Sequence, residues 1–184
     1  MARELLDKKR FLSGKLRIYS DGQEVGYIKL KPFSSSAVSK FYGNELIFEN
    51  KGFFSFQTTI KDANNKEVIG RANSIFTLFK KRKIELTIDD QVYLWKPGGI
   101  SGSKWAITDS NGETVIDAKL NRSDKLDTDS INNLMLTGLY FRANYQRNLE
   151  VVSSVITLLI IFLIIDIRAI SGIVSETIHE WTQH

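Results

Sequence analysis

The chain has 184 residues, a length that fits one domain and allows a buried core without metal or disulfide staples. It contains no cysteine, which excludes a disulfide framework, a thiol nucleophile and thiolate metal sites and favours a reducing compartment such as the cytoplasm. The formal net charge of +4 favours anionic surfaces but is too small to indicate nucleic acid, which we do not expect as a partner.

Residues 1–10 contain no long apolar run and include the basic cluster Lys8-Lys9-Arg10, so the sequence predicts no cleaved export signal. Through the first two thirds of the chain, apolar and polar residues alternate in short runs, which is typical of strands with one buried face. The clearest hairpin has alternation over 84–88 and a turn at 89–91. Its second strand offers two faces, Val92 with Leu94 and Tyr93 with Trp95.

Three of the expected hairpins look like copies of one unit. Each copy has a glycine or asparagine three positions before a valine, where a tight turn needs a residue that tolerates positive φ. An ordinary β-meander, in which every hairpin has a similar turn, is the alternative. The three pairs are Gly22 and Val25, Asn65 and Val68, and Gly112 and Val115.

The pattern changes after Asp127. Residues 134–141 are mostly apolar and residues 142–147 are polar, which predicts a last hairpin or strand that leads into a C-terminal helix. The following segment Val151–Ile165 contains no charge, glycine or proline and is too long for an ordinary strand. A helix that is apolar on all sides must be surrounded by protein or by lipid.

Length favours protein as the surroundings of this helix. The charge-free stretch covers roughly 23 Å, whereas the hydrocarbon core of a membrane is about 30 Å thick. A membrane span would draw Glu150 or Asp166 inward, although Ile167, Ala169 and Ile170 could extend it. We therefore expect a single domain over 1–184, with strands over about 11–145, a central helix over about 148–168 and a tail over 169–184.

The hairpins around Asp62-Asn65-Val68 and Asp109-Gly112-Val115, followed by a helix ending at Asp166, resemble the tubby C-terminal-like superfamily. That superfamily includes tubby domains, phospholipid scramblases and plant LURP-one-related proteins. The resemblance covers most of the chain as a pattern, and it implies a mainly β fold, a closed antiparallel β-barrel wrapped around a hydrophobic C-terminal helix. The scramblases' cysteine-rich stretch has no counterpart here, so their lipid-moving activity is not carried over.

The candidate binding residues form one basic cluster between two apolar strands, and they are Lys80, Lys81, Arg82 and Lys83. Consecutive cations at a turn attract anionic lipid headgroups. The resemblance supports this reading, because tubby domains bind phosphoinositides through basic residues. A solvated hairpin turn without a ligand is the alternative.

No constellation for catalysis is visible. The two histidines, His179 and His184, stand five positions apart, whereas a helical zinc site needs them four apart to face the same metal. We therefore expect no metal, no cofactor and no enzymatic activity.

The sequence then supports two functions. The first is a non-catalytic tubby-like binding or scaffold module in the cytoplasm, with an anionic phospholipid membrane or a protein as its partner. The second is a single-pass membrane protein with a cytoplasmic β-domain and a C-terminal transmembrane anchor. The sequence does not indicate an oligomeric state.

Overall fold

The fold is described by a computed structural model of residues 1–184. The described parts of the chain are residues 14–20, 22–32, 34, 36–51, 55–75, 83–99, 104–118 and 128–181; the side chains of 55–56, 74–75 and 166–181 are outside the description. The chain forms two compact units, Met1–Tyr145 and Gln146–His184.

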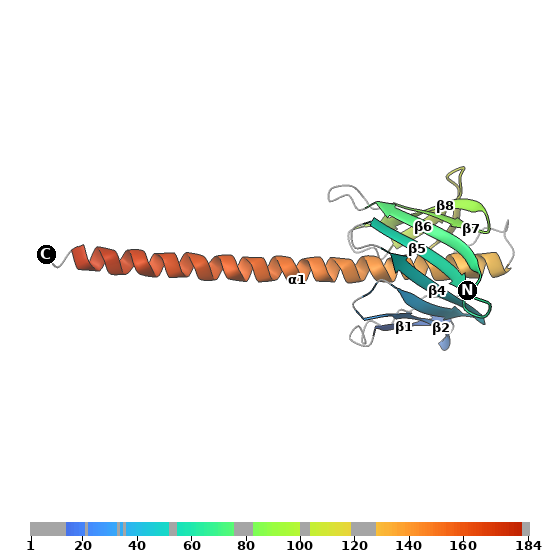
Figure 1. The fold of residues 1–184 in the computed structure, drawn as a ribbon, viewed down its shortest axis with the longest axis horizontal. Coiled ribbons are helices and arrows are strands. Elements are labelled where there is room, and N and C mark those ends of the chain that lie inside the picture. The colour runs from blue at the N-terminus through green and yellow to red at the C-terminus, as the bar shows by residue number, and fades with distance from the viewer. Residues whose placement is uncertain are drawn as a thin grey trace. The chain divides into compact units, whose positions relative to one another are not determined.

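The first unit contains one antiparallel sheet of ten strands whose order in space is their order in the chain (Figure 1). Among the described residues, hydrogen bonds join each strand to the next, and no ladder joins the first strand to the last. The fold is therefore mainly β, and the sheet is not closed by hydrogen bonds. The strands are β1 (Lys15–Ser20), β2 (Gln23–Leu30), β3 (Ala37–Phe41), β4 (Asn44–Lys51), β5 (Ser55–Asp62), β6 (Val68–Ile75), β7 (Ile84–Ile88), β8 (Gln91–Gly98), β9 (Lys104–Thr108) and β10 (Thr114–Asp117).

The single described helix, α1 (Thr128–Trp181), contributes to both units. Its first part, Ile131–Tyr145, packs against the concave side of the sheet and is buried over most of its circumference. The inward residues of the strands and this part of α1 form one continuous apolar core.

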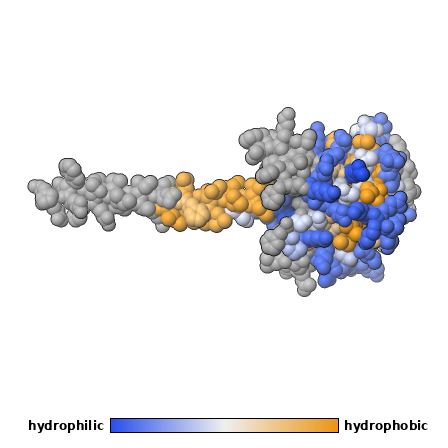
Figure 2. Space-filling model, viewed as in Figure 1, coloured by the Kyte–Doolittle hydropathy of each residue, from blue (hydrophilic) through white to orange (hydrophobic). Residues whose placement is uncertain are grey.

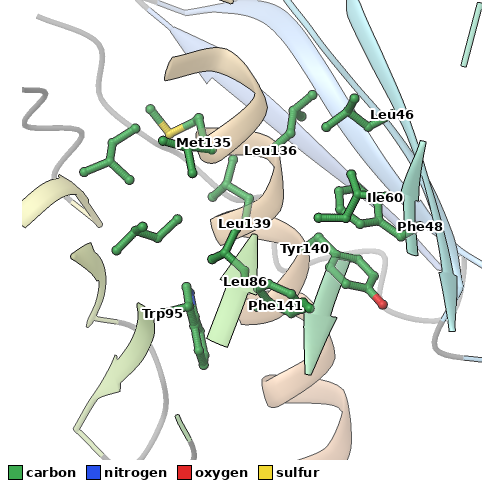
Figure 3. Close-up of a cluster of buried hydrophobic side chains, with 14 of the residues drawn as sticks. Leu46, Phe48, Ile60, Leu86, Trp95, Met135, Leu136, Leu139, Tyr140 and Phe141 are labelled. Atoms are coloured by element: carbon green, nitrogen blue, oxygen red, sulfur yellow. The ribbon is translucent and has the colours of Figure 1, made fainter. Parts of the chain in front are cut away.

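Aromatic side chains join the helix to the sheet. The ring of Tyr140 stacks on Phe48 of β4 at a centroid distance of 4.0 Å, and Trp95 of β8 lies 5.9 Å from Phe141. Figure 3 shows these residues between the two sides of the curved sheet. Because the core is lined by strands from β1 to β10, the sheet and this helical segment depend on each other for burial.

The predicted turns are largely confirmed. Gly22 and Gly112 have φ values of 80° and 84°, as a tight hairpin requires. In the middle copy the positive φ of 64° falls on Lys66 and not on Asn65. The Asp62 carboxylate accepts hydrogen bonds from the backbone N–H groups of Asn64 and Asn65, at 2.7 and 3.3 Å, which stabilises that turn.

The hairpin over 84–95 is confirmed, with Ile88 paired to Gln91 across the turn. Of the two faces offered by β8, the aromatic one is buried: Trp95 is 0% exposed and Val92 is 49% exposed. Large rings fill the space between sheet and helix better than the smaller aliphatic side chains do.

The prediction for the helix was wrong in its position. The helix begins at Thr128 and not at about 148, so residues 134–147 are helical and not a last strand. The helix that fills the core is Ile131–Tyr145, and the side chains expected to fill it, Leu149–Ile165, are exposed. Much of the expected tail is also helical, because the backbone of α1 continues to Trp181.

The height of the sheet explains why only one of these segments is enclosed. The longest strands have 8 residues, as in β4, and span about 26 Å. The segment Ile131–Tyr145 already extends over about 22 Å of helix axis. A sheet of this height covers one such segment and has no room for a second of similar length.

Candidate functional site

The most unusual surface in the described residues is the apolar segment, which we define as Leu149–Ile165 of α1. Every residue of this segment is exposed, and apart from Glu150 its large side chains are aliphatic or aromatic. Leu159 and Phe162 are 62% and 63% exposed, whereas Leu136 in the core is 0% exposed. Figure 2 shows hydrophobic residues over the visible surface of this segment. Water is an unfavourable environment for so much contiguous apolar area.

No single face of the apolar segment is buried. Consecutive residues from Val155 to Ile165 differ little in exposure, although they point in all directions around the helix axis. A helix that docks on one protein partner normally shows an apolar stripe opposite a polar face. The uniform distribution instead fits surroundings that are apolar on every side. By length and composition, the helix is able to cross a membrane.

Two of the three hydroxyl groups of the apolar segment bond within the helix. The Ser154 hydroxyl donates to the carbonyl oxygen of Glu150 at 2.8 Å, and the Thr157 hydroxyl donates to that of Ser153 at 2.9 Å. Such bonds to the preceding turn satisfy a hydroxyl donor without water. These two polar side chains are therefore compatible with a hydrocarbon environment.

Of the predicted lipid-binding cluster, Lys80, Lys81 and Arg82 lie outside the described residues. Lys83 is described and exposed, directly before β7. Its neighbour Ile84 pairs with Trp95, and the Trp95 ring lies 6.2 Å from that of Tyr145. Lys83 is therefore at the end of the sheet where the buried part of α1 ends.

Other lysines lie on the outer face of the sheet, and they lower the pKa of one carboxylate, that of Glu49. The Lys61 ammonium donates to the Glu49 carboxylate at 2.8 Å. This hydrogen bond, with further attraction from Lys31 and Lys51, lowers the pKa of Glu49 below its ordinary value. Sequence patterns gave no sign of this pairing, because it depends on the register between β4 and β5.

Metal chemistry has no support in the part of the chain that the structure describes. No three acidic, histidine or cysteine residues there are grouped so as to hold an ion. The side chain of His179 and the whole of His184 lie outside the description, so the sequence-based expectation for them is unchanged.

The apolar segment is conspicuous in the sequence, which predicts that it fills the core. In the structure the core is filled by Ile131–Tyr145 instead. The true core segment was less conspicuous because Asn132, Thr137 and Asn144 interrupt its apolar run, although all three are buried. Comparison of the chain with family models, with curated proteins and with solved structures gives no match in any of the three.

Proposed function

We propose that this protein is a membrane-anchored, non-catalytic binding or scaffold domain. The apolar segment and the residues after it, to about Ile170, form a single membrane span, and the unit Met1–Tyr145 is held at the cytoplasmic surface. The observation that carries the proposal is the difference in burial between two parts of α1. Ile131–Tyr145 already fills the core, while Leu149–Ile165 is exposed and apolar all round.

The length of the helix supports a span. Residues 151–170 cover about 30 Å of helix axis, which matches the hydrocarbon thickness of a bilayer. The described backbone remains helical beyond this range, to Trp181. Asp166 and Arg168 then stand within the last turns of the span, where the cost of a charge is well below the roughly 2.5–3.5 kcal/mol at the centre.

The free energy also favours lipid over water for this segment. Roughly a dozen large apolar side chains at about 1.5–3 kcal/mol each give on the order of 20–30 kcal/mol for transfer out of water. The inserted state loses little in exchange, since the backbone hydrogen bonds stay within the helix.

We further propose that the unit Met1–Tyr145, which we call the β-domain, is a closed barrel of tubby-like architecture. Ten strands in chain order leave β1 and β10 antiparallel to each other if they meet. Ile18 of β1 and Ile116 of β10 belong to the same buried core, which supports their proximity. Paired cysteines introduced into Lys15–Ser20 and Thr114–Asp117 should form a disulfide readily, because the chain has no competing cysteine. A failure of every pair to cross-link would argue for an open sheet.

A non-catalytic role fits the position of the histidines. His179 and His184 follow the proposed span, so a membrane would separate them from the β-domain. The β-domain would then have neither histidine nor cysteine with which to build a nucleophilic or acid–base site.

The experiment that tests the anchor compares residues 1–148 with the full chain, both expressed without detergent. The shorter chain retains the whole core and should be soluble, while the full chain should sediment with membranes and resist extraction by alkaline carbonate. Two arginines within the segment, Leu158→Arg with Phe162→Arg, should release the full chain from membranes, and Ser153→Leu should not. A soluble full chain beside an insoluble 1–148 would overturn the proposal.

A further inference from the structure

The β-domain has two distinct ends, because strands that follow one another in an antiparallel sheet place their connections alternately at opposite ends. One end is marked by Tyr145, whose ring lies 6.2 Å from that of Trp95. The other is marked by Asn133, whose side-chain oxygen accepts a 3.5 Å hydrogen bond from the Asn44 amide. The buried part of α1 runs from the second end to the first.

Lysines gather at the Tyr145 end, which we call the basic end. They stand at the strand ends or next to them, and they are Lys15, Lys29, Lys31, Lys51, Lys83 and Lys104. The described carboxylates at or near these positions are fewer, and they are Glu49, Glu85 and Asp117. The described residues of this end therefore carry a net positive charge.

Two of the lysines of the basic end are cross-strand neighbours. Lys15 of β1 pairs directly with Lys29 of β2, an arrangement of like charges that is unfavourable in an isolated sheet. Lys15 lies over the Tyr27 ring, 4.3 Å from its centroid, which offsets part of that repulsion.

The opposite end, which we call the acidic end, has the reverse charge. Its turns carry carboxylates, among them Asp62, Glu67, Asp89, Asp90, Asp109 and Glu113. The first turn of α1 adds Asp129. The cations at the described strand ends and turns of this side are fewer, and they are Lys40, Lys61 and Lys66.

Only a short stretch of chain connects the basic end to the proposed span. Tyr145 packs against the core, and the charge-free run begins at Val151. The chain between these residues reaches at most about 20 Å even when fully extended. Tyr145 is therefore held within about this distance of the start of the charge-free run, while the rotation of the domain about that attachment is left to other forces.

We propose that the basic end of the β-domain binds the anionic phospholipid headgroups of the membrane in which the chain is anchored, with the acidic end directed away. This inference rests on the proposed membrane anchoring and adds an orientation and a lipid class to it. The lysines of the basic end would lie within the range of the surface potential, which decays over about 10 Å at 0.1 M salt. The carboxylates of the acidic end would lie beyond it.

The test uses the full chain reconstituted into vesicles of phosphatidylcholine with or without phosphatidylserine. Because the chain has no cysteine, single probes are introduced by Pro32→Cys at the basic end and by Ser110→Cys at the acidic end. Energy transfer to headgroup-labelled lipid then gives the distance of each probe from the membrane surface. With phosphatidylserine, the Pro32→Cys probe should be nearer by about 20 Å, the length of a strand of six residues.

Matched charge reversals identify the cause of the orientation. Lys29→Glu with Lys31→Glu should reduce the difference between the probes to the value found in pure phosphatidylcholine. Lys40→Glu with Lys66→Glu changes the net charge equally at the acidic end and should leave the difference unchanged. Added salt at 0.5 M should act like the first pair, because screening is stronger there, with a Debye length well below 10 Å.

Two failures are distinguishable in the same samples. If the chain resists carbonate extraction but the two probes are equally distant from the headgroups, the orientation is wrong and the anchor stands. If the chain is extracted, the anchor itself is wrong, and the inference fails with it.

Discussion

Gly138 stands in the buried part of α1 because the ring of Trp105 occupies the space of a side chain. A Cβ at this position would overlap ring atoms of Trp105, closer than side-chain carbons approach one another. Glycine normally costs about 1 kcal/mol inside a helix relative to alanine. Here the cost is offset by the close packing of an indole ring on the helix backbone.

We predict that Gly138→Ala destabilises the β-domain by about 1–3 kcal/mol, as overpacking of a well-filled core does. Helix propensity alone would predict the opposite sign. Thermal unfolding of the full chain in detergent micelles measures the change. Combining Gly138→Ala with Trp105→Leu should recover part of the loss of the first substitution, and additive effects of the two changes would contradict the proposed overlap.

The turn between β7 and β8 holds two residues in the left-handed region without glycine. Asp89 and Asp90 have φ values of 49° and 60°. Two-residue hairpin turns favour glycine at the second of these positions. Asp90→Gly should therefore raise the stability of the domain by roughly 0.5–1 kcal/mol, because the left-handed conformation costs glycine no steric strain.

The control for this substitution lies in another turn. Asn64 follows Asp62 between β5 and β6 and is not among the residues with positive φ. Asn64→Gly should give no gain in unfolding temperature, because it only increases the freedom of the unfolded chain. An equal gain from both substitutions would mean that the strain at Asp90 is not the cause.

At the scale of the elements, strands such as β2, β3 and β7 could be predicted from alternation because buried residues alternate with more exposed ones along them. The turn residues Gly22 and Gly112 were identifiable because few residue types tolerate their conformation. The choice of the Trp95 face over the Val92 face could not be predicted, since both faces of β8 carry large apolar side chains. That choice is made by contact with Phe141 and Tyr145.

The burial of Ile131–Tyr145 could not be predicted either, because it also depends on contacts between elements. Its polar residues are accommodated by specific partners, which a hydropathy pattern does not contain. The Thr137 hydroxyl donates to the Asn133 carbonyl oxygen at 2.7 Å, and the Asn133 side chain bonds to Asn44. A more uniformly apolar segment nearby therefore looked like the better core, although it is the exposed one.

We predict that the β-domain cannot form without the first part of α1. A chain of residues 1–127 would leave the inner face of the sheet uncovered, including Phe48 and Trp95, and should aggregate. Residues 1–148, which add only the helix that fills the core, should be monodisperse. Size-exclusion chromatography compares the two. A soluble and folded 1–127 would show that the sheet is stable without its helix.

At the scale of the whole molecule, one helix contains two apolar segments with different surroundings. Ile131–Tyr145 is complementary to a particular sheet, with a glycine and polar groups at fixed positions. Leu149–Ile165 contains no glycine and is exposed on every side, and its Ser154 and Thr157 hydroxyl groups bond to the helix itself rather than to another element. Specific packing needs residues of several kinds, whereas lipid needs only a uniform apolar surface of sufficient length. The less varied segment is therefore the candidate for the membrane.

The distribution of charge then predicts the direction of the span. After Val151 the chain contains one basic residue, Arg168, whereas Arg142 and Arg147 closely precede the apolar segment. Positive residues beside a span remain on the cytoplasmic side. The β-domain should be cytoplasmic, and a glycosylation acceptor appended after His184 should be modified when the chain is inserted into microsomes. The same acceptor placed before Met1 should remain unmodified, and modification at that position instead would reverse the topology and remove the basic end from the anionic cytoplasmic leaflet.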